Sequence, residues 1–155
     1  MKIYTKTGDE GISDVLGKRV KKSDKIFDLI GTVDTLSAVL SLGVSFCANE
    51  SVKKEILLLQ KDLVKLNGKI SGYADFDFDV SFFESRIDFY SEKTVGFSLY
   101  DTPQRKDSAF INLARTVCRK AERCAAGYDE NNTDLIRYLN RMSDYLYAVG
   151  KYLDI

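Results

Sequence analysis

Hydrophobic residues recur every three or four positions along most of the chain, which is the spacing of one face of an α-helix. The pattern predicts helices over residues 23–43, 51–70, 81–93, 107–126 and 133–153. In the second of these, the apolar spacing alternates between four and three, which is typical of a seam packed against other helices. Because the connections are short, we predict an all-α fold, an antiparallel five-helix bundle.

Residues 1–22 lack this period and carry three glycines and six basic residues. We predict a loop here, ordered or able to become ordered, and a single domain over 1–155 that joins this loop to a helical bundle over 23–155. Residues 73–80 alternate aromatic and acidic side chains, but the segment is short and lacks a partner strand, so we predict a loop. Ser81 to Glu84 has the capping-box pattern that would begin the third helix.

The residue types that are missing exclude several chemistries. The chain has no histidine, which excludes histidine acid–base catalysis, histidine-dependent triads and histidine-ligated metals. Lys+Arg and Asp+Glu both number 23, so no net field attracts nucleic acid or an acidic membrane, and any anion site must be built locally. Cys47, Cys118 and Cys124 form no CxxC motif and are expected to be buried thiols in a reducing compartment. No signal peptide or bilayer-spanning apolar run is evident, so we expect a cytoplasmic protein.

One side of the fourth predicted helix carries charged residues of a particular kind. At about 100° per residue, Arg115, Arg119, Glu122 and Arg123 fall within a sector of roughly 100°. A solvated face with exchanging surface ion pairs would have a similar pattern. However, three arginines without a lysine suit bidentate binding of oxyanions, whereas solvated faces usually mix both cations.

Two further residues stand out on the predicted helices. Asn140 is a poor residue for a helix interior, and it is either a functional group or a surface amide. Asp34 lies among Phe27, Ile30 and Ala38 at helical spacing, so we expect it to be partly buried and to need a cation. Arg115 is the natural candidate, and the alternative is an exposed, unpaired aspartate.

The segment from Thr5 to Gly11 reads Thr-Lys-Thr-Gly-Asp-Glu-Gly. Glycines let backbone N–H groups approach an anion, lysine supplies a point charge, and threonine hydroxyls add donors. The GxxxxGK[ST] spacing of a P-loop is absent. The segment therefore has the chemistry of a phosphate-binding loop, although many glycine-rich loops serve only as turns.

Five segments together resemble a known family. In chain order they are Tyr4–Gly11, Lys18–Asp24, Gly31–Asp34, Ala114–Arg123 and Tyr138–Leu146. This order, with the Thr-Lys-Thr-Gly-Asp opening and the Arg-x-x-x-Arg-x-x-Glu-Arg helix, resembles the ATP:corrinoid adenosyltransferases of the propanediol-utilisation type. The resemblance spans nearly the whole chain.

The resemblance implies a five-helix bundle that assembles as a homotrimer with active sites between neighbouring subunits. It implies transfer of the 5′-deoxyadenosyl group of ATP to the cobalt of reduced cobalamin, release of triphosphate, and Mg²⁺ bridging phosphate oxygens. It further implies a reductase and a B12-dependent enzyme as partners, and neither nucleic acid nor a membrane.

By position, the resemblance also assigns roles to residues. The residues that would wrap the nucleotide are Thr5, Lys6, Thr7, Gly8, Asp9, Gly11 and Ser13, with Lys22 on the phosphates. The adjacent subunit would complete the ATP site with Arg119, Glu122, Arg123 and Asn140, and Asp34 would form a salt bridge with Arg115. Phe97 would pack beneath the corrin ring, where an apolar wall excludes a lower axial ligand of cobalt.

The chain departs from the family pattern between Leu99 and Pro103, where the family usually has Pro-Gly-Gly, and it has Thr35 and Lys120 where the family has an acidic residue and an arginine. The altered connector suggests a second hypothesis, a non-catalytic protein that holds ATP or adenosylcobalamin for delivery or sensing. A helical bundle without a ligand is a third. The absent histidine agrees best with the first hypothesis, since cobalt(I) is itself the nucleophile and needs no protein base.

Overall fold

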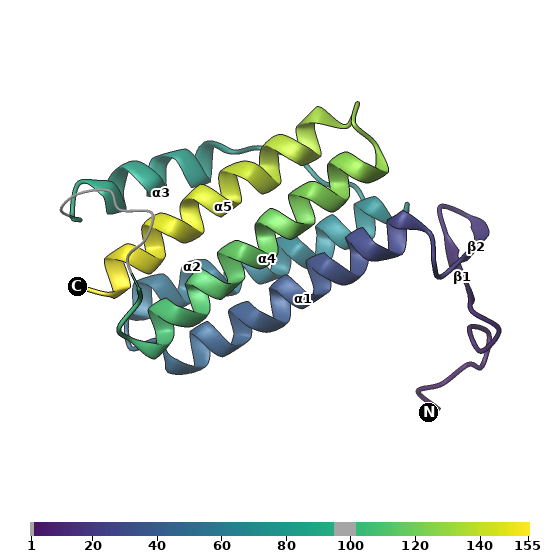
Figure 1. Cartoon of the computed structure of the whole chain (residues 1–155), viewed down its shortest axis with the longest axis horizontal. Helices are drawn as coiled ribbons and strands as arrows, with labels where there is room; N and C mark the ends of the chain where they lie inside the picture. The colour runs from purple at the N-terminus through teal and green to yellow at the C-terminus, as the bar shows by residue number, and fades with distance from the viewer. Residues whose placement is uncertain (1, 95–101) are drawn as a thin grey trace.

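The computed structural model describes residues 2–94 and 102–155, and within these ranges five helices form an elongated bundle (Figure 1). The helices are α1 (Lys25–Phe46), α2 (Glu50–Ile70), α3 (Ser81–Ser91), α4 (Lys106–Tyr128) and α5 (Thr133–Leu153). A short hairpin of β1 (Ile12–Val15) and β2 (Lys18–Lys21) precedes them. The predicted all-α fold class is confirmed.

Three helices begin where the sequence places a capping residue. The side chains of Asp24, Asn49 and Asn132 accept hydrogen bonds from the first free amides of α1, α2 and α5. The predicted capping box of α3 is wrong. Asp79 instead accepts hydrogen bonds from both the amide and the hydroxyl of Ser81, and Glu84 lies near Arg141. The side chains that would form the box therefore have other partners.

The prediction of a loop over residues 1–22 is wrong for residues 12–21. β1 and β2 pair antiparallel in the register Ile12 to Lys21, and Leu16 and Gly17 form the turn with φ of 53° and 69°. A strand of four residues is too short for the two-residue alternation of apolar and polar side chains to stand out in the sequence. A leucine also stands where such turns usually have asparagine or glycine, so the local signal for a hairpin is weak.

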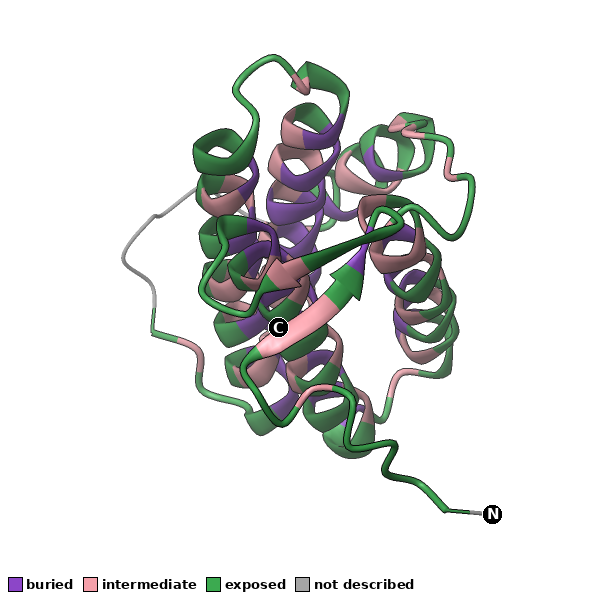
Figure 2. Ribbon diagram, turned by 90° about the vertical axis from the view of Figure 1, so that its right-hand side faces the viewer, coloured by how far each residue is buried: buried purple, intermediate pink, exposed green. Residues whose placement is uncertain are grey.

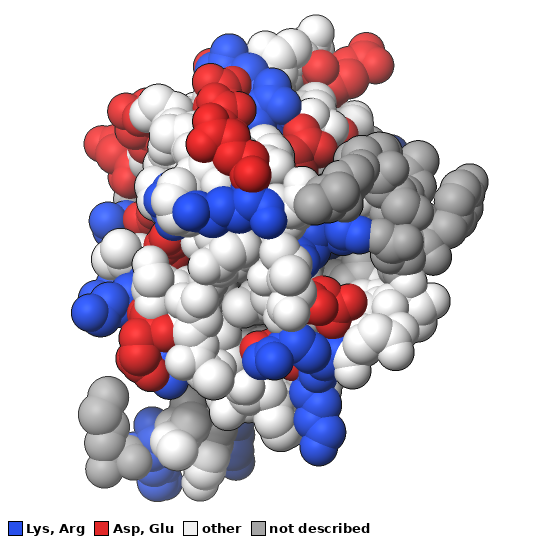
Figure 3. Space-filling model, turned by 90° about the vertical axis from the view of Figure 1, so that its left-hand side faces the viewer, with Lys and Arg blue, Asp and Glu red and all other residues white. Residues whose placement is uncertain are grey.

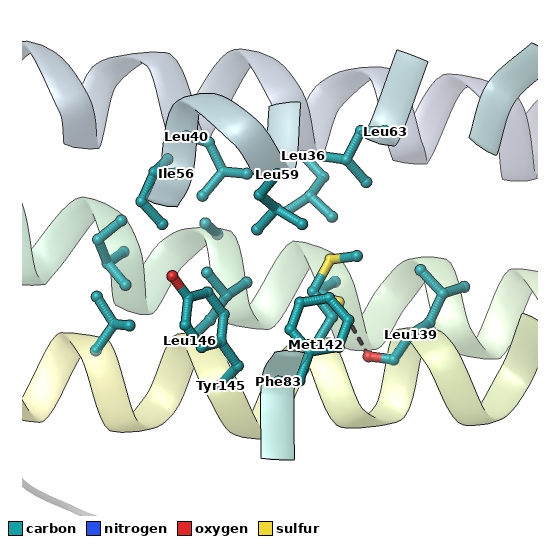
Figure 4. Close-up of a cluster of buried hydrophobic side chains, with 14 of the residues drawn as sticks. Leu36, Leu40, Ile56, Leu59, Leu63, Phe83, Leu139, Met142, Tyr145 and Leu146 are labelled. Atoms are coloured by element: carbon teal, nitrogen blue, oxygen red, sulfur yellow. Dashed lines mark hydrogen bonds between the residues drawn. The ribbon is translucent and has the colours of Figure 1, made fainter. Parts of the chain in front are cut away.

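The core lies between all five helices (Figure 2). α4 packs between α1 and α5, while α2 covers α1 and α3 covers α5. The close-up in Figure 4 shows Leu36 of α1, Leu59 of α2, Phe83 of α3 and Met142 of α5 pointing toward one another in the core. All three cysteines are free thiols, and Cys47 and Cys118 are buried as predicted, whereas Cys124 is only half-buried.

A polar network inside the bundle holds α3 in place. The carboxylate of Glu55 on α2 pairs with Arg86 and accepts hydrogen bonds from the Tyr90 hydroxyl at 2.8 Å and the Tyr145 hydroxyl at 3.1 Å. Burial raises the pKa of Tyr90 to about 12, so this hydroxyl stays a donor over the physiological range. Because one carboxylate joins α2, α3 and α5, the network fixes α3 beside the cavity described below.

α1 differs from the prediction in one further respect. It is long and apolar enough to pass a length-and-composition test for a membrane span, with a mean hydropathy of 1.6, although the sequence pattern suggested no such run. Core helices of water-soluble proteins pass the same test. One side of α1 indeed packs in the core through Leu29, Leu36 and Leu40, each fully buried.

The first turn of α4 is held by the far end of the chain. Asp154 accepts hydrogen bonds from the amides of Gln104 and Arg105 and from the Ser108 hydroxyl, at 2.8 to 3.1 Å. Burial acts to raise the pKa of Asp154, but these hydrogen bonds outweigh it and hold the pKa below its usual value. The carboxylate therefore stabilises the folded state only while it is ionised.

Replacing Asp154 by asparagine is expected to lower the melting temperature at pH 7, because the asparagine side chain cannot offer a charged acceptor to the backbone amides of Gln104 and Arg105, just before α4. Since folding lowers this pKa, the stabilisation is complete above the unfolded-state pKa of about 4 and is lost as the pH falls through the folded-state value. The melting temperatures of wild type and Asp154→Asn should therefore converge in a series from pH 7 to pH 3. Asp88→Asn, at an exposed position of α3, is the control. A difference that stays constant with pH would contradict the role of the charge.

Candidate functional site

A cavity of about 660 Å³ lies between α3, α4 and α5. Within the described residues its basic side chains are Arg115 and Arg119 from α4 and Arg141 and Lys151 from α5, and Asp144 is its acidic side chain. Ile87 of α3 and Ala148 of α5 supply apolar wall. A cavity with four cations and one carboxylate suits an anionic ligand that also has an apolar part.

The basic groups of the cavity differ in their partners. Arg115 donates from Nε to the Asn112 side chain at 2.9 Å, and Arg141 lies between Glu84 at 3.2 Å and Asp144 at 3.0 Å. In the part of the chain that the structure describes, the guanidinium of Arg119 makes no hydrogen bond and no ion pair. Its donors are therefore available to a ligand, in the planar arrangement that matches phosphate oxygens.

Two of the other predicted site residues meet across α4 and α5. The Asn140 side-chain amide donates to Glu122 Oε1 at 3.1 Å. Arg123 is exposed, and its Nη1 donates to the Arg119 carbonyl at 3.2 Å. The structure thus gathers Arg115, Arg119, Glu122, Arg123 and Asn140 on neighbouring turns of two helices. On the end of the molecule drawn in Figure 3, basic and acidic side chains are interspersed rather than separated by sign.

Asp34 does not have the environment predicted for it. Its side chain is exposed, and no ion pair joins it to Arg115 in the described chain. Asp34 lies one residue beyond the buried Val33, about 100° around the helix. Phe27, Ile30 and Ala38 share its outer side and are not fully buried, so the apolar neighbours that suggested burial form a surface.

The segment that precedes the hairpin, residues 2–11, is termed the arm here. Its residues from Thr5 to Gly11 are largely exposed, and Thr7 accepts a hydrogen bond from Arg19 at 3.1 Å. The Lys22 amide donates to the Gly11 carbonyl at 2.8 Å, and its ammonium lies 2.9 Å from the place that a Cβ on Gly8 would occupy. Lys22 and the glycine-rich turn therefore come together, as a phosphate-binding loop requires.

The arm and the arginine cavity do not meet in one chain. The arm extends away from the bundle at the end where α1 begins (Figure 1). Among the described residues, no hydrogen bond or ion pair joins the arm to Arg115, Arg119 or Arg123. Phe97, predicted to lie under a corrin ring, is outside the described residues. Arg141 and Lys151 were not predicted, although with Asp144 they follow a helical spacing that a wheel of α5 would have revealed.

The fold and the cavity define a helical-bundle protein that offers arginines to an anionic ligand. Residues 3–153 match the model of the cobalamin adenosyltransferase family, and the chain belongs to this family.

Similar proteins have names of the same kind. The corrinoid adenosyltransferase of Bacillus subtilis (strain 168) is 31% identical over 97% of this chain and 86% of its own length. The cobalamin adenosyltransferase of Cupriavidus metallidurans is 32% identical over 99% of this chain and 88% of its own length. Among solved structures, a phenylalanine-to-alanine variant of a PduO-type ATP:corrinoid adenosyltransferase from Lactobacillus reuteri, complexed with cobalamin and ATP, superposes with a TM-score of 0.89 and 25% identity, covering 99% of this chain and 93% of that one.

Proposed function

We propose that the chain transfers the 5′-deoxyadenosyl group of ATP to the cobalt of cob(I)alamin and releases triphosphate. Family membership supports the reaction class. The observation that carries the proposal for this chain is the cavity in which Arg119 offers its full set of donors beside Arg115. A guanidinium with free donors suits the triphosphate leaving group, because the negative charge on that group grows as its bond to C5′ breaks.

The reaction asks little acid–base chemistry of the protein. The electron pair of cobalt(I) forms the bond to C5′ as the bond from C5′ to the triphosphate oxygen breaks, and the electrons of that bond leave with triphosphate. The chain must hold C5′ in line with cobalt and stabilise the leaving group. Arginines and lysines can position the substrate and stabilise the leaving group without a histidine, and the chain has no histidine.

The arm is proposed to wrap the triphosphate of ATP. Lys6 and Lys22 supply charge, Gly8 and Gly11 allow close backbone approach, and the remaining donors are Thr5, Thr7 and Ser13, with Asp9 in the same turn. The described residues hold no cluster of three or more acidic or thiol groups fit to bind a metal ion. We therefore assign Mg²⁺ to the phosphates of ATP rather than to a cage in the protein.

We place each active site between two subunits of a homotrimer in the cytoplasm. The arm of one subunit would reach Arg119, Arg123, Glu122 and Asn140 of the next, since they lie apart within one chain. The outer side of α1 supports such an assembly, because Leu42 and Phe46 are 46% and 47% exposed. We assign Asp34, on the same side, to an ion pair with Arg115 of a neighbouring subunit. A reductase that supplies cob(I)alamin and an enzyme that uses the product are the proposed partners.

The reaction can be tested directly. Anaerobic incubation with ATP, Mg²⁺ and chemically reduced cobalamin should yield the visible spectrum of a cobalt–carbon product, and omission of ATP should abolish it. If ATP raises the melting temperature but no product forms, the chain is a binding protein rather than an enzyme. If neither occurs, the proposed function is wrong.

A further inference from the structure

The tip of the hairpin has an unusual residue. Leu16 adopts φ of 53°, in the left-handed region that side chains other than asparagine, aspartate and glycine rarely occupy. Two-residue hairpin turns usually place asparagine or glycine there. A leucine in this conformation persists only where its surroundings compensate for the strain, so the contacts of Leu16 are informative.

Those contacts join the hairpin to the end of α2. The Leu16 amide donates to the Ser71 carbonyl at 2.9 Å. Gly72, which follows, has φ of 81°, and a Cβ there would lie 2.8 Å from Leu16 Cδ2 and 3.3 Å from Leu16 Cα. Position 72 thus requires glycine both for its backbone conformation and for the space that Leu16 occupies.

The arm begins at the opposite end of the same hairpin. β1 has four residues, which at about 3.4 Å each separates the tip from the arm by roughly 14 Å. The Ile12–Lys21 pair and the hydrogen bond from Lys22 to Gly11 continue the pairing to the base of the arm. A change in where the tip is held therefore moves the arm.

We propose that Leu16 and Gly72 form a positioning joint that directs the arm toward its ATP, so that both residues govern ATP affinity without touching the nucleotide. This inference rests on the proposed function of the arm in ATP binding. Neither residue belongs to the groups assigned above to ATP, cobalamin or the cavity.

Leu16→Asn tests the contact with Gly72 without disturbing the hairpin turn. Asparagine suits the left-handed conformation better than leucine, so the hairpin itself should form at least as well. The packing of the leucine side chain on Gly72 is lost. If the arm then keeps its competent direction about a tenth of the time, the apparent dissociation constant for ATP rises about tenfold. kcat at saturating ATP and KM for cobalamin should stay within about twofold of wild type, because bound ATP restores the competent arm.

Gly72→Ala alters the other residue of the joint and should also raise the apparent dissociation constant for ATP. Gly127→Ala is the matched control, because a Cβ there meets nothing within 4 Å. Trypsin should cleave faster after Lys18 to Lys22 in both joint variants but not in the control. Melting temperatures will show whether all three variants fold.

Lys6→Ala distinguishes the two ways in which the idea can fail. If Lys6→Ala weakens ATP binding but Leu16→Asn and Gly72→Ala do not, the joint is wrong and the proposed function stands. If Lys6→Ala also leaves ATP binding unchanged, the arm is not the ATP site, and both the joint and the assignment of the arm are overturned.

Discussion

Replacing Arg119 by alanine is expected to lower kcat by about a thousandfold, because removal of one donor from a developing anion costs roughly 10²- to 10³-fold. The charge on triphosphate grows as the C5′–oxygen bond breaks, so kcat should fall more than ATP affinity. The fold should survive, since the exposed guanidinium has no partner among the described residues. Steady-state kinetics with chemically reduced cobalamin, alongside circular dichroism and melting curves, measures both quantities.

Lys120→Ala is the matched control for Arg119→Ala. Lys120 is the next residue of α4 and is exposed, but it does not line the cavity. Its replacement by alanine removes the same positive charge as Arg119→Ala. It should retain wild-type kcat. Activity of Arg119→Ala within tenfold of wild type would contradict the assignment of the cavity.

The helices were predictable because their signals are local and repeated. Each long helix has several turns of apolar spacing and most have a capping residue such as Asp24, Asn49 or Asn132 that acts within three residues. The hairpin was not predictable in the same way. Leu16, at the turn, contacts Ser71 and Gly72, which are more than fifty positions away in the chain.

The site was predictable to the extent that it lies on one helix face or on two adjacent ones. The wheel placed Arg115 and Arg119 together, and the structure brings both to one cavity. The wheel could not place Asp34, because the same apolar spacing serves a buried side of a helix and a side that another subunit would cover. A single sequence records which residues share a face but not what packs on that face.

Two inactive variants are expected to restore activity to one another if the active site is shared between subunits. Lys6→Ala removes charge from the arm, and Arg119→Ala removes it from the cavity. In a trimer assembled at random from equal amounts of the two, a site is intact when the Arg119→Ala subunit lends its arm to a Lys6→Ala subunit. A closed ring of three that contains both variants has one such pair among its three interfaces, so about a third of the wild-type activity should return in the mixed assemblies.

Co-expression with two different affinity tags, followed by tandem purification, isolates the mixed assemblies for the same anaerobic assay. Mixtures of Lys6→Ala with Lys22→Ala are the control, because both changes lie on one side of the proposed interface and every subunit lacks one of these two lysines. If the arm instead folded back onto its own cavity, every chain in the first mixture would carry one defect in its own site and no activity would return. Recovery in the first mixture alone therefore requires that the arm and Arg119 of one site come from different chains.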